Sequence, residues 1–216
     1  MQKGVQMAKL DVAQLDVTKT NDAIERLLEV TENPRHRFLL QNFYRHRYLE
    51  ITGRYEEIFV PEMTVEHPVY HMHAQGISTT LDGREAVEGL YRYWAETNQC
   101  IFYVLEEEVA VADHFIATVS TAFEQILGKA LIEGGIHVDD ENAMYLYKST
   151  DEMFWPYDDR GRMVGEDVWE VDPSKAEITK LDPADVMTVE EAAEKLNPLI
   201  KPLPSFDEEV LGASRR

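Results

Sequence analysis

The hydrophobic period of the chain changes between residues 58 and 63, and this change limits the fold more than any other feature. Before it, apolar and aromatic residues recur every three or four positions, as on one face of a helix: Leu40, Tyr44, Tyr48, Ile51, Tyr55 and Ile58. After it the period is two, which places the following residues on one face of an extended strand: Met63, Val65, His67, Val69, His71 and His73. The chain therefore combines helices and strands.

The remaining segments predict helices first and antiparallel strands later. A helix begins near Thr20, Pro34 ends it and starts the next one, and a third helix runs to about Asn98. The predicted strands form a meander with a strong hairpin turn at 158–161, and they span residues 101–112, 115–127, 143–149, 152–157 and 163–171. This order predicts an α+β fold rather than a series of βαβ units.

The same patterns divide the chain into three parts. Residues 1–33 form an N-terminal arm and helix, of which 1–17 are expected to be loosely held. Residues 34–181 form the main domain, and residues 182–216 a C-terminal extension with a proline-rich tail. In this extension Thr188 and Glu191 have the spacing of a capping box, which predicts the start of a short helix.

Composition excludes several classes of partner. The chain of 216 residues has 41 acidic and 21 basic residues and a net charge of −20, which repels nucleic acids and anionic membrane surfaces. No apolar run approaches the ~20 residues that a membrane helix needs. The N-terminus has no apolar signal-peptide core, and the one cysteine, Cys100, excludes an internal disulfide framework. These features predict a soluble, cytoplasmic protein.

Three local motifs resemble the NTF2-like superfamily, which includes the ketosteroid isomerases and the SnoaL-like proteins. Residues 59–68 resemble the isomerase segment that ends in Val-Glu-Asp-Pro, and residues 83–87 are similar to the start of the third isomerase helix. Residues 161–169 look like the closing strand of SnoaL-like cyclases. The resemblance covers roughly residues 34–181 and implies a cone, with N-terminal helices packed on a curved antiparallel sheet that encloses a pocket. The superfamily contains both enzymes and binding proteins, so the fold does not settle the function.

The histidines of the predicted strand are the first candidate site residues. His67 stands where the isomerases carry the aspartate that shuttles a proton, and an imidazole suits acid–base chemistry near neutral pH. The alternative is a buried histidine satisfied by a backbone carbonyl. His71 is a second catalytic candidate and His73 a substrate-binding one. Three imidazoles on one face could bind zinc or iron, but the resemblance implies a metal-free site.

Two tyrosines of the long helix are candidate proton donors. Tyr44 and Tyr48 lie on its buried stripe, where a hydroxyl could donate to a developing oxyanion or to a leaving hydroxyl. The isomerases carry a tyrosine on this helix, and a count without gaps from His67 leads to Phe43 instead. Both tyrosines could equally be core residues. The neighbouring His46 and Arg47 are expected to be exposed or at the pocket mouth.

Glu166 is the candidate acid of the closing strand. The second acid of the isomerases does not carry over, because a count from the turn places Met153 at its position. By the same count Glu166 and Glu170 face the pocket, and a buried carboxyl there would have a raised pKa and could act as an acid or pair with His67. Asp167 takes this place if the register is one residue different, and a surface ladder of acids is the alternative.

Five aromatic residues are expected to form the pocket wall and bind the substrate: Trp94, Phe123, Tyr145, Trp155 and Trp169.

These residues predict a cofactor-independent acid–base lyase that acts on a small hydrophobic, phenolic substrate. Within the superfamily the pocket resembles that of the diarylpropane lyases of aromatic catabolism, which release water and formaldehyde from lignin-derived diols. The alternatives are a scytalone-type dehydratase, a polyketide cyclase or isomerase, and a non-catalytic ligand-binding module. An epoxide hydrolase would need an Asp-Arg-Asp relay that the sequence does not place. The resemblance also implies a homo-oligomer that assembles through the outer face of the sheet.

Overall fold

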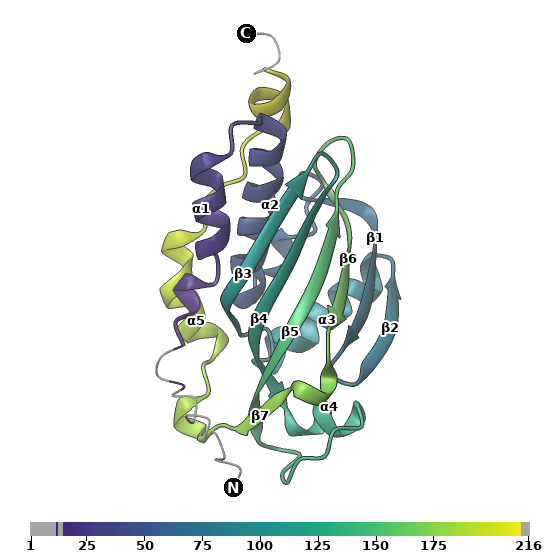
Figure 1. The fold of residues 1–216 in the computed structure, drawn as a ribbon, viewed down its shortest axis with the longest axis vertical. Helices are drawn as coiled ribbons and strands as arrows, with labels where there is room; N and C mark the ends of the chain where they lie inside the picture. The colour runs from purple at the N-terminus through teal and green to yellow at the C-terminus, as the bar shows by residue number, and fades with distance from the viewer. Residues whose placement is uncertain (1–11, 13–14, 213–216) are drawn as a thin grey trace, which may run out of the picture.

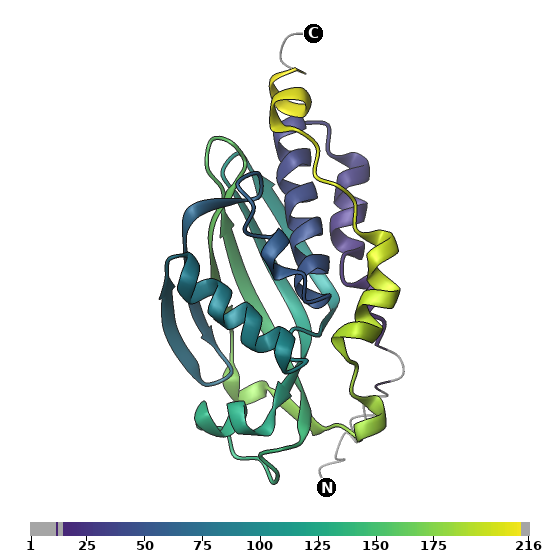
Figure 2. The same cartoon turned by 180° about the vertical axis from the view of Figure 1, so that it is seen from behind.

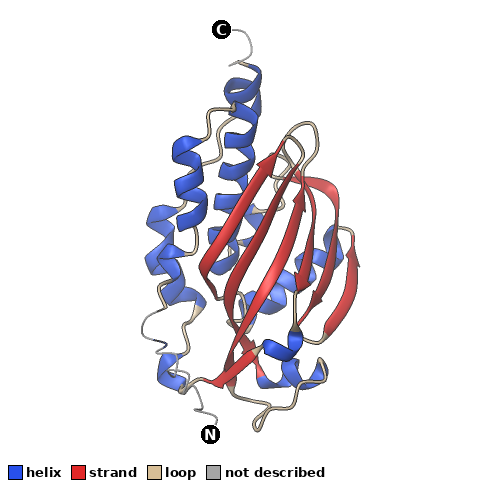
Figure 3. Cartoon of the chain, viewed as in Figure 1, coloured by secondary structure: helices blue, strands red, loops and turns tan. Residues whose placement is uncertain are grey.

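The computed structural model describes residue 12 and residues 15–212, and its centre is a curved seven-stranded sheet (Figures 1 and 3). The strands are β1 (Thr64–Ala74), β2 (Ile77–Asp82), β3 (Phe102–Ala112), β4 (Phe115–Leu127), β5 (Met144–Pro156), β6 (Met163–Glu170) and β7 (Glu177–Lys180). Their order is β2-β1-β6-β5-β4-β3, and β7 pairs with β5. The pair β1–β6 is parallel and the other pairs are antiparallel, so the expectation of a purely antiparallel sheet is wrong at this pair.

Helices cover one face of the sheet. They are α1 (Asp22–Val30), α2 (Pro34–Ile51), α3 (Arg84–Glu96), α4 (Gly128–Glu133) and α5 (Val189–Leu196). Helices α2 and α3 lie across the concave face, and α1 and α5 lie beside α2 (Figure 2). The predicted α+β cone, with helices packed on a curved sheet around a pocket, is confirmed.

Helix α2 is buried on nearly all sides and is the central element of the helical layer. Asn33 caps it through Oδ1, which accepts hydrogen bonds from the backbone of Arg35 (2.9 Å) and His36 (3.3 Å), and Pro34 occupies the first turn. Its buried side chains point both toward the sheet and away from it: Phe38, Leu39, Leu40, Asn42, Phe43, Tyr44, His46, Arg47, Tyr48, Leu49 and Ile51. The helix therefore has a sheet side and an outer side, and both are packed.

The N-terminal and C-terminal segments pack on the outer side of α2. The capping box of Thr188 and Glu191 is present at the start of α5, as predicted. Of residues 1–17, only 12 and 15–17 are described, and Val17 is fully buried, so the expectation of a loose arm is wrong at this residue. The boundaries at residues 33 and 181 stay predictions.

Several elements differ from the sequence prediction. The strand β5 is continuous through residues 150 and 151, where two strands were predicted. The strands β2 and β7 and the helix α4 were not predicted. The period of two in β1 is confirmed, but Tyr70 is on its buried face and His67 and His71 are on its exposed face.

Candidate functional site

A cavity of about 340 Å³ lies between the concave face of the sheet and helices α2 and α3. Its walls are largely apolar and aromatic, because alternate residues of each strand face it and most of these are apolar. They are Met72 and Ala74 on β1, Phe102 and Val104 on β3, Ala122 and Ile126 on β4, Met153 and Trp155 on β5, and Val168 on β6. Leu90, Tyr93 and Trp94 of α3 form the opposite wall. This volume lies at the lower end of the range of about 300–1,000 Å³ that is usual for small-molecule sites.

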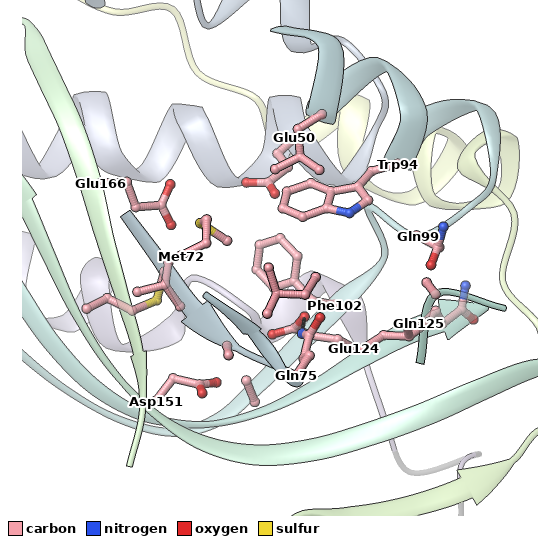
Figure 4. A pocket seen from close by; sticks show the side chains of 18 of the residues that line it. Glu50, Met72, Gln75, Trp94, Gln99, Phe102, Glu124, Gln125, Asp151 and Glu166 are labelled. Atoms are coloured by element: carbon pink, nitrogen blue, oxygen red, sulfur yellow. Dashed lines mark hydrogen bonds between the residues drawn. The ribbon is translucent and has the colours of Figure 1, made fainter. Parts of the chain in front are cut away.

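Five acids line this apolar space: Glu133 of α4, whose side chain is 66% exposed, and four less exposed ones. Glu50 comes from α2, Glu124 from β4, Asp151 from β5 and Glu166 from β6. Figure 4 shows them around the same space, with the rings of Trp94 and Phe102 among them. The site is therefore a cavity with apolar walls and several acids.

Glu166 is buried and has no hydrogen-bonding partner among the residues that the structure describes. Glu166 is 6% exposed. Burial raises its pKa well above the usual range, repulsion from Glu50 adds to the rise, and Arg47 opposes it. Glu166 thus lines the cavity, as the turn count predicts, and its surroundings favour the protonated form. Its catalytic role stays a prediction.

The residue before Glu166 fixes the strand against its neighbour. A Cβ atom added at Gly165 would lie 1.9 Å from the backbone oxygen of Val69 on β1. Only glycine allows this close approach, and it sets Glu166 beside Tyr70 in the parallel pair. Asp167 points outward, and its side chain is about half exposed.

Asp151 has one free oxygen. The residue is 3% exposed, and its Oδ2 accepts a hydrogen bond of 2.7 Å from Ser149. Its Oδ1 has no partner within the described part of the chain. Burial raises the pKa of Asp151 to about 6, against the effect of Ser149, and repulsion from Glu170 contributes. The adjacent Glu170, predicted to face the pocket, is buried but does not line the cavity. Its carboxylate accepts hydrogen bonds from the backbone N–H of Gln75 and from the hydroxyl of Tyr147, each at 2.8 Å.

Glu124 and Glu50 complete the acidic set. Burial and repulsion from Asp151 raise the pKa of Glu124 to about 8, and the side-chain amide of Gln75 donates a hydrogen bond to its carboxylate. Glu50 lies 3.6 Å from Nε2 of His46. Glu124, Asp151 and Glu166 therefore have raised pKa values, and burial is the largest cause in each.

Arg47 lines the cavity, but its charge is already paired. Its guanidinium donates two hydrogen bonds to Glu107, of 2.5 and 3.0 Å, and stands 4.4 Å from the ring of Phe43. The side chains of this ion pair are 3% and 2% exposed. The expectation that His46 and Arg47 are exposed or at the mouth is wrong, because Glu107 pairs with Arg47 and the hydroxyl of Tyr91 lies 2.9 Å from the His46 ring.

The three histidines of β1 lie on the outer face of the sheet, so their predicted placement in the pocket is wrong. His67 has a side chain that is 69% exposed and lies 2.8 Å from Asp82. His71 lies 2.5 Å from Asp167, and His73 lies 2.9 Å from the hydroxyl of Ser78. The even residues of this strand are the larger apolar ones, Tyr70 and Met72, and they turn inward while the imidazoles turn to solvent.

The two tyrosines of α2 point away from the cavity, which corrects the second catalytic prediction. The hydroxyl of Tyr44 donates to the backbone oxygen of Leu199 at 3.0 Å, and that of Tyr48 donates to Thr18 at 2.8 Å. They anchor the terminal segments to the outer side of the helix. The cavity is lined instead by Arg47 and Glu50, which lie on the sheet side.

Two of the five predicted wall residues, Trp94 and Trp155, line the cavity. The other three lie elsewhere. Phe123 is buried on the face of β4 that points away from the cavity. The Tyr145 hydroxyl donates a hydrogen bond to Asp139 in the loop before β5, and Trp169 is 56% exposed.

Sequence reasoning missed Arg47, Glu50, Glu124 and Asp151 as cavity residues. A signal for two of them exists. Glu124 alternates with Ala122 and Ile126, and Asp151 alternates with Met153 and Trp155, so each acid interrupts an otherwise apolar face of a strand.

Comparisons with known proteins concern the fold. No family model matches the chain, and no curated protein matches it. Similar solved structures include an NTF2-like protein from Anabaena variabilis, with 11% identity, a TM-score of 0.46 and coverage of 66% of this chain and 94% of that one. The epoxide hydrolase/cyclase-like enzyme SalBIII of pyran ring formation in salinomycin has 10% identity, a TM-score of 0.42 and coverage of 66% and 93%. A computationally designed 17-OHP binder has 12% identity, a TM-score of 0.44 and coverage of 68% and 98%.

Two further findings concern membrane helices and metal sites in the described part of the chain. Within residues 12 and 15–212, no helix has the length and apolar character needed to cross a membrane. In the same part of the chain, no group of three or more histidine, cysteine, aspartate or glutamate side chains is arranged to hold a metal ion.

Proposed function

We propose that this chain is a cofactor-independent enzyme that performs acid–base chemistry on a small hydrophobic, aromatic substrate in the cavity. The observation that carries the proposal is the pair of buried acids Glu166 and Asp151. The first has a pKa far above its usual range, and the second has a pKa of about 6 and a free oxygen. Two acids whose surroundings separate their pKa values in this way suit the roles of general acid and general base.

The roles follow from the surroundings of the two acids, which favour the protonated form of Glu166 more strongly than that of Asp151. Asp151 is mostly ionised, and its Oδ1 accepts a proton from a carbon of the substrate. As the carbon–carbon double bond forms, the neighbouring carbon–oxygen bond breaks, and Glu166 gives its proton to the leaving hydroxyl, which departs as water. An isomerase would use the same two groups but return the proton to a different carbon. A lyase is our first choice and an isomerase the second.

The walls of the cavity suit an aromatic substrate. Trp94, Phe102 and Trp155 provide ring faces and edges for stacking, and the apolar surroundings keep water from the two acids. The predicted deformylation of a diarylpropane diol used Glu166 together with His67 and Tyr44 or Tyr48, and of these only Glu166 lines the cavity. Our proposal therefore keeps the reaction class and not that substrate.

A turnover screen tests the proposal. A panel of hydroxylated aromatic compounds would be incubated with the protein and followed by ultraviolet absorbance and by release of formaldehyde. For a compound that reacts, we expect Asp151→Asn to reduce kcat/KM by about 10²- to 10⁴-fold. The control is Asp167→Asn, a half-exposed aspartate on the outer face, which should retain activity. Binding of a compound in the cavity with no turnover anywhere in the panel would contradict the enzyme and favour a ligand-binding module.

We also propose that the chain forms a homo-oligomer through the outer face of the sheet. Apolar side chains are exposed there, with Val119 at 46%, Phe154 at 39% and Trp169 at 56%. Exposed apolar surface on a sheet face is typical of an interaction site. Light scattering of the wild type and of Phe154→Glu tests this, and a monomeric wild type would contradict it.

A further inference from the structure

We propose that the ligand of this cavity is an organic cation, an aromatic or arylalkyl compound that carries a protonated amine or a quaternary ammonium. The inference rests on the proposed function, because it names the substrate class of the same site. It differs from the phenolic substrate class predicted from the sequence in one property, the positive charge.

The first argument is the charge of the walls. Five acids line the cavity, one of them the exposed Glu133, and Arg47 is the only cationic residue among the described residues that do so. The guanidinium of Arg47 is committed to Glu107 through two hydrogen bonds. The cavity therefore has no free positive group with which its acids can pair.

The second argument is the state of the individual oxygens. Asp151 Oδ1 is buried without a hydrogen bond, and the carboxyl of Glu166 likewise has no partner among the described residues. A buried carboxylate without a partner is costly, whereas a carboxylate paired with a cation that also donates hydrogen bonds is stable. An ammonium group supplies both the charge and the N–H donors.

The third argument is the aromatic lining. Tyr93 and Trp94 of α3 and Phe102 of β3 contribute rings to the same cavity. The face of an aromatic ring attracts a cation, most strongly where both are shielded from water. Aromatic rings together with carboxylates are thus complementary to a cation with an apolar body.

The raised pKa values of the acids agree with this assignment. Burial is the main cause, and repulsion between carboxyl groups adds to it. Both effects describe acids that face apolar walls and one another. A cation bound beside Asp151 would favour its ionised form, which is the form that acts as the base.

The cation is organic rather than a metal ion. In the described part of the chain no group of three or more potential ligands converges in a metal-binding arrangement. The remaining walls are apolar, which suits a carbon skeleton and not a hydrated ion.

Three probes with similar apolar bodies test the inference: 2-phenylethylammonium, 2-phenylethanol and 3-phenylpropionate. Binding would be measured by calorimetry and by the fluorescence of the tryptophans that line the cavity. We expect the ammonium to bind at least about tenfold more tightly than the alcohol, and the carboxylate to bind more weakly than either. An alcohol that binds as tightly as the ammonium, or more tightly, would overturn the inference.

Charge-neutral variants locate the effect. In Asp151→Asn, which removes the ionised carboxylate, the preference for the ammonium over the alcohol should fall by about fivefold or more, and in Glu166→Gln it should fall by less. Asp167→Asn should keep the wild-type preference. Each amide is nearly isosteric and removes repulsion between acids, so the variants should fold, and thermal unfolding checks this. An unchanged preference in both cavity variants would contradict the assignment.

The same samples separate this inference from the proposed function. Turnover of a neutral compound without any preference for the ammonium would reject the cation and leave the enzyme in place. A preference for the ammonium that is lost in the cavity variants, without turnover of any compound, would support the cation and reject the enzyme.

Discussion

The outer face of β1 and the cavity behind the sheet both carry groups that can exchange protons, but their surroundings are opposite. On the outer face, the His67 and His71 side chains are 69% and 47% exposed, and each lies against an aspartate. In the cavity, Glu166 and Asp151 are buried, and each has at least one oxygen without a partner in the described residues. The comparison teaches that a buried titratable group without a hydrogen-bonding partner identifies a candidate catalytic site better than residue type does.

The largest expected effect concerns turnover, and it tests directly whether the cavity or the outer face of β1 carries the chemistry. On a substrate found in the screen, Glu166→Gln should reduce kcat/KM by about 10²- to 10⁴-fold, because the amide has no proton to give. His67→Gln should leave kcat/KM within about twofold, because its side chain is on the other face of the sheet. A strong loss in His67→Gln with full activity in Glu166→Gln would reverse our assignment.

The next effect concerns stability and tests how fully the charge of Arg47 is paired. Arg47→Met should lower the free energy of unfolding by about 3–5 kcal/mol, because Glu107 then remains buried without its partner. The double variant Arg47→Met with Glu107→Gln should recover much of this loss. Urea denaturation measures both, and a loss below about 1 kcal/mol in the single variant would show that solvent reaches Glu107.

A smaller effect is the dependence of stability on pH. The pKa of Glu124 is about 8 in the folded protein against an ordinary value of 4.5, so the folded state holds its proton more tightly than the unfolded state. Stability from this group is therefore full below about pH 4.5 and declines as the pH rises toward 8. Glu124→Gln should raise the free energy of unfolding at pH 8 by on the order of 1–3 kcal/mol and have little effect at pH 4.5.

The control for this variant is Glu85→Gln, which changes an exposed acid of α3. It should leave the pH profile unchanged. Asp151, Glu50 and Glu170 interact with Glu124 and remain in the Glu124→Gln variant, so part of the slope should persist. Thermal unfolding from pH 4.5 to 8 measures the profiles, and a Glu124→Gln variant less stable than wild type at pH 8 would contradict the raised pKa.

The smallest effect belongs to the outer face. Asp82→Asn removes the partner of His67 where both side chains are largely exposed. The free energy of unfolding should change by less than about 0.5 kcal/mol, since solvent screens such pairs. A loss above about 1 kcal/mol in urea denaturation would show that the outer face of β1 is better protected than its exposure indicates.

The parts of the fold that depend on local signals are predictable from the sequence. Pro34 begins α2, Thr188 and Glu191 cap α5, and the turn at 158–161 fixes the register of β6. From that turn the period of two carries through to Glu166, which is why this one acid is placed correctly on the cavity side. Local chemistry determines each of these features.

The rest of the site is not predictable from the sequence, because it depends on which of two faces of a strand or helix lines the cavity. In β1 the odd face contains Val65 and Val69 and the even face contains Tyr70 and Met72, so alternation alone does not identify the inner one. In α2 the stripe of Tyr44 and Tyr48 is buried by the terminal segments and not by the cone. Periodicity reports that a face is buried but not what buries it.

The close approach at Gly165 has a consequence for reading a saturation mutagenesis map of this strand. Even an alanine there would drive its methyl group into the backbone of Val69 and separate β6 from β1. Substitutions at positions 165 and 166 would then both abolish activity. At 165 the cause is a lack of space for a side chain, and at 166 it is the loss of the acid that donates a proton. Abundance measured alongside activity would tell them apart, because the Gly165 variants would be lost from the soluble fraction, while Glu166→Gln would remain as folded, inactive protein.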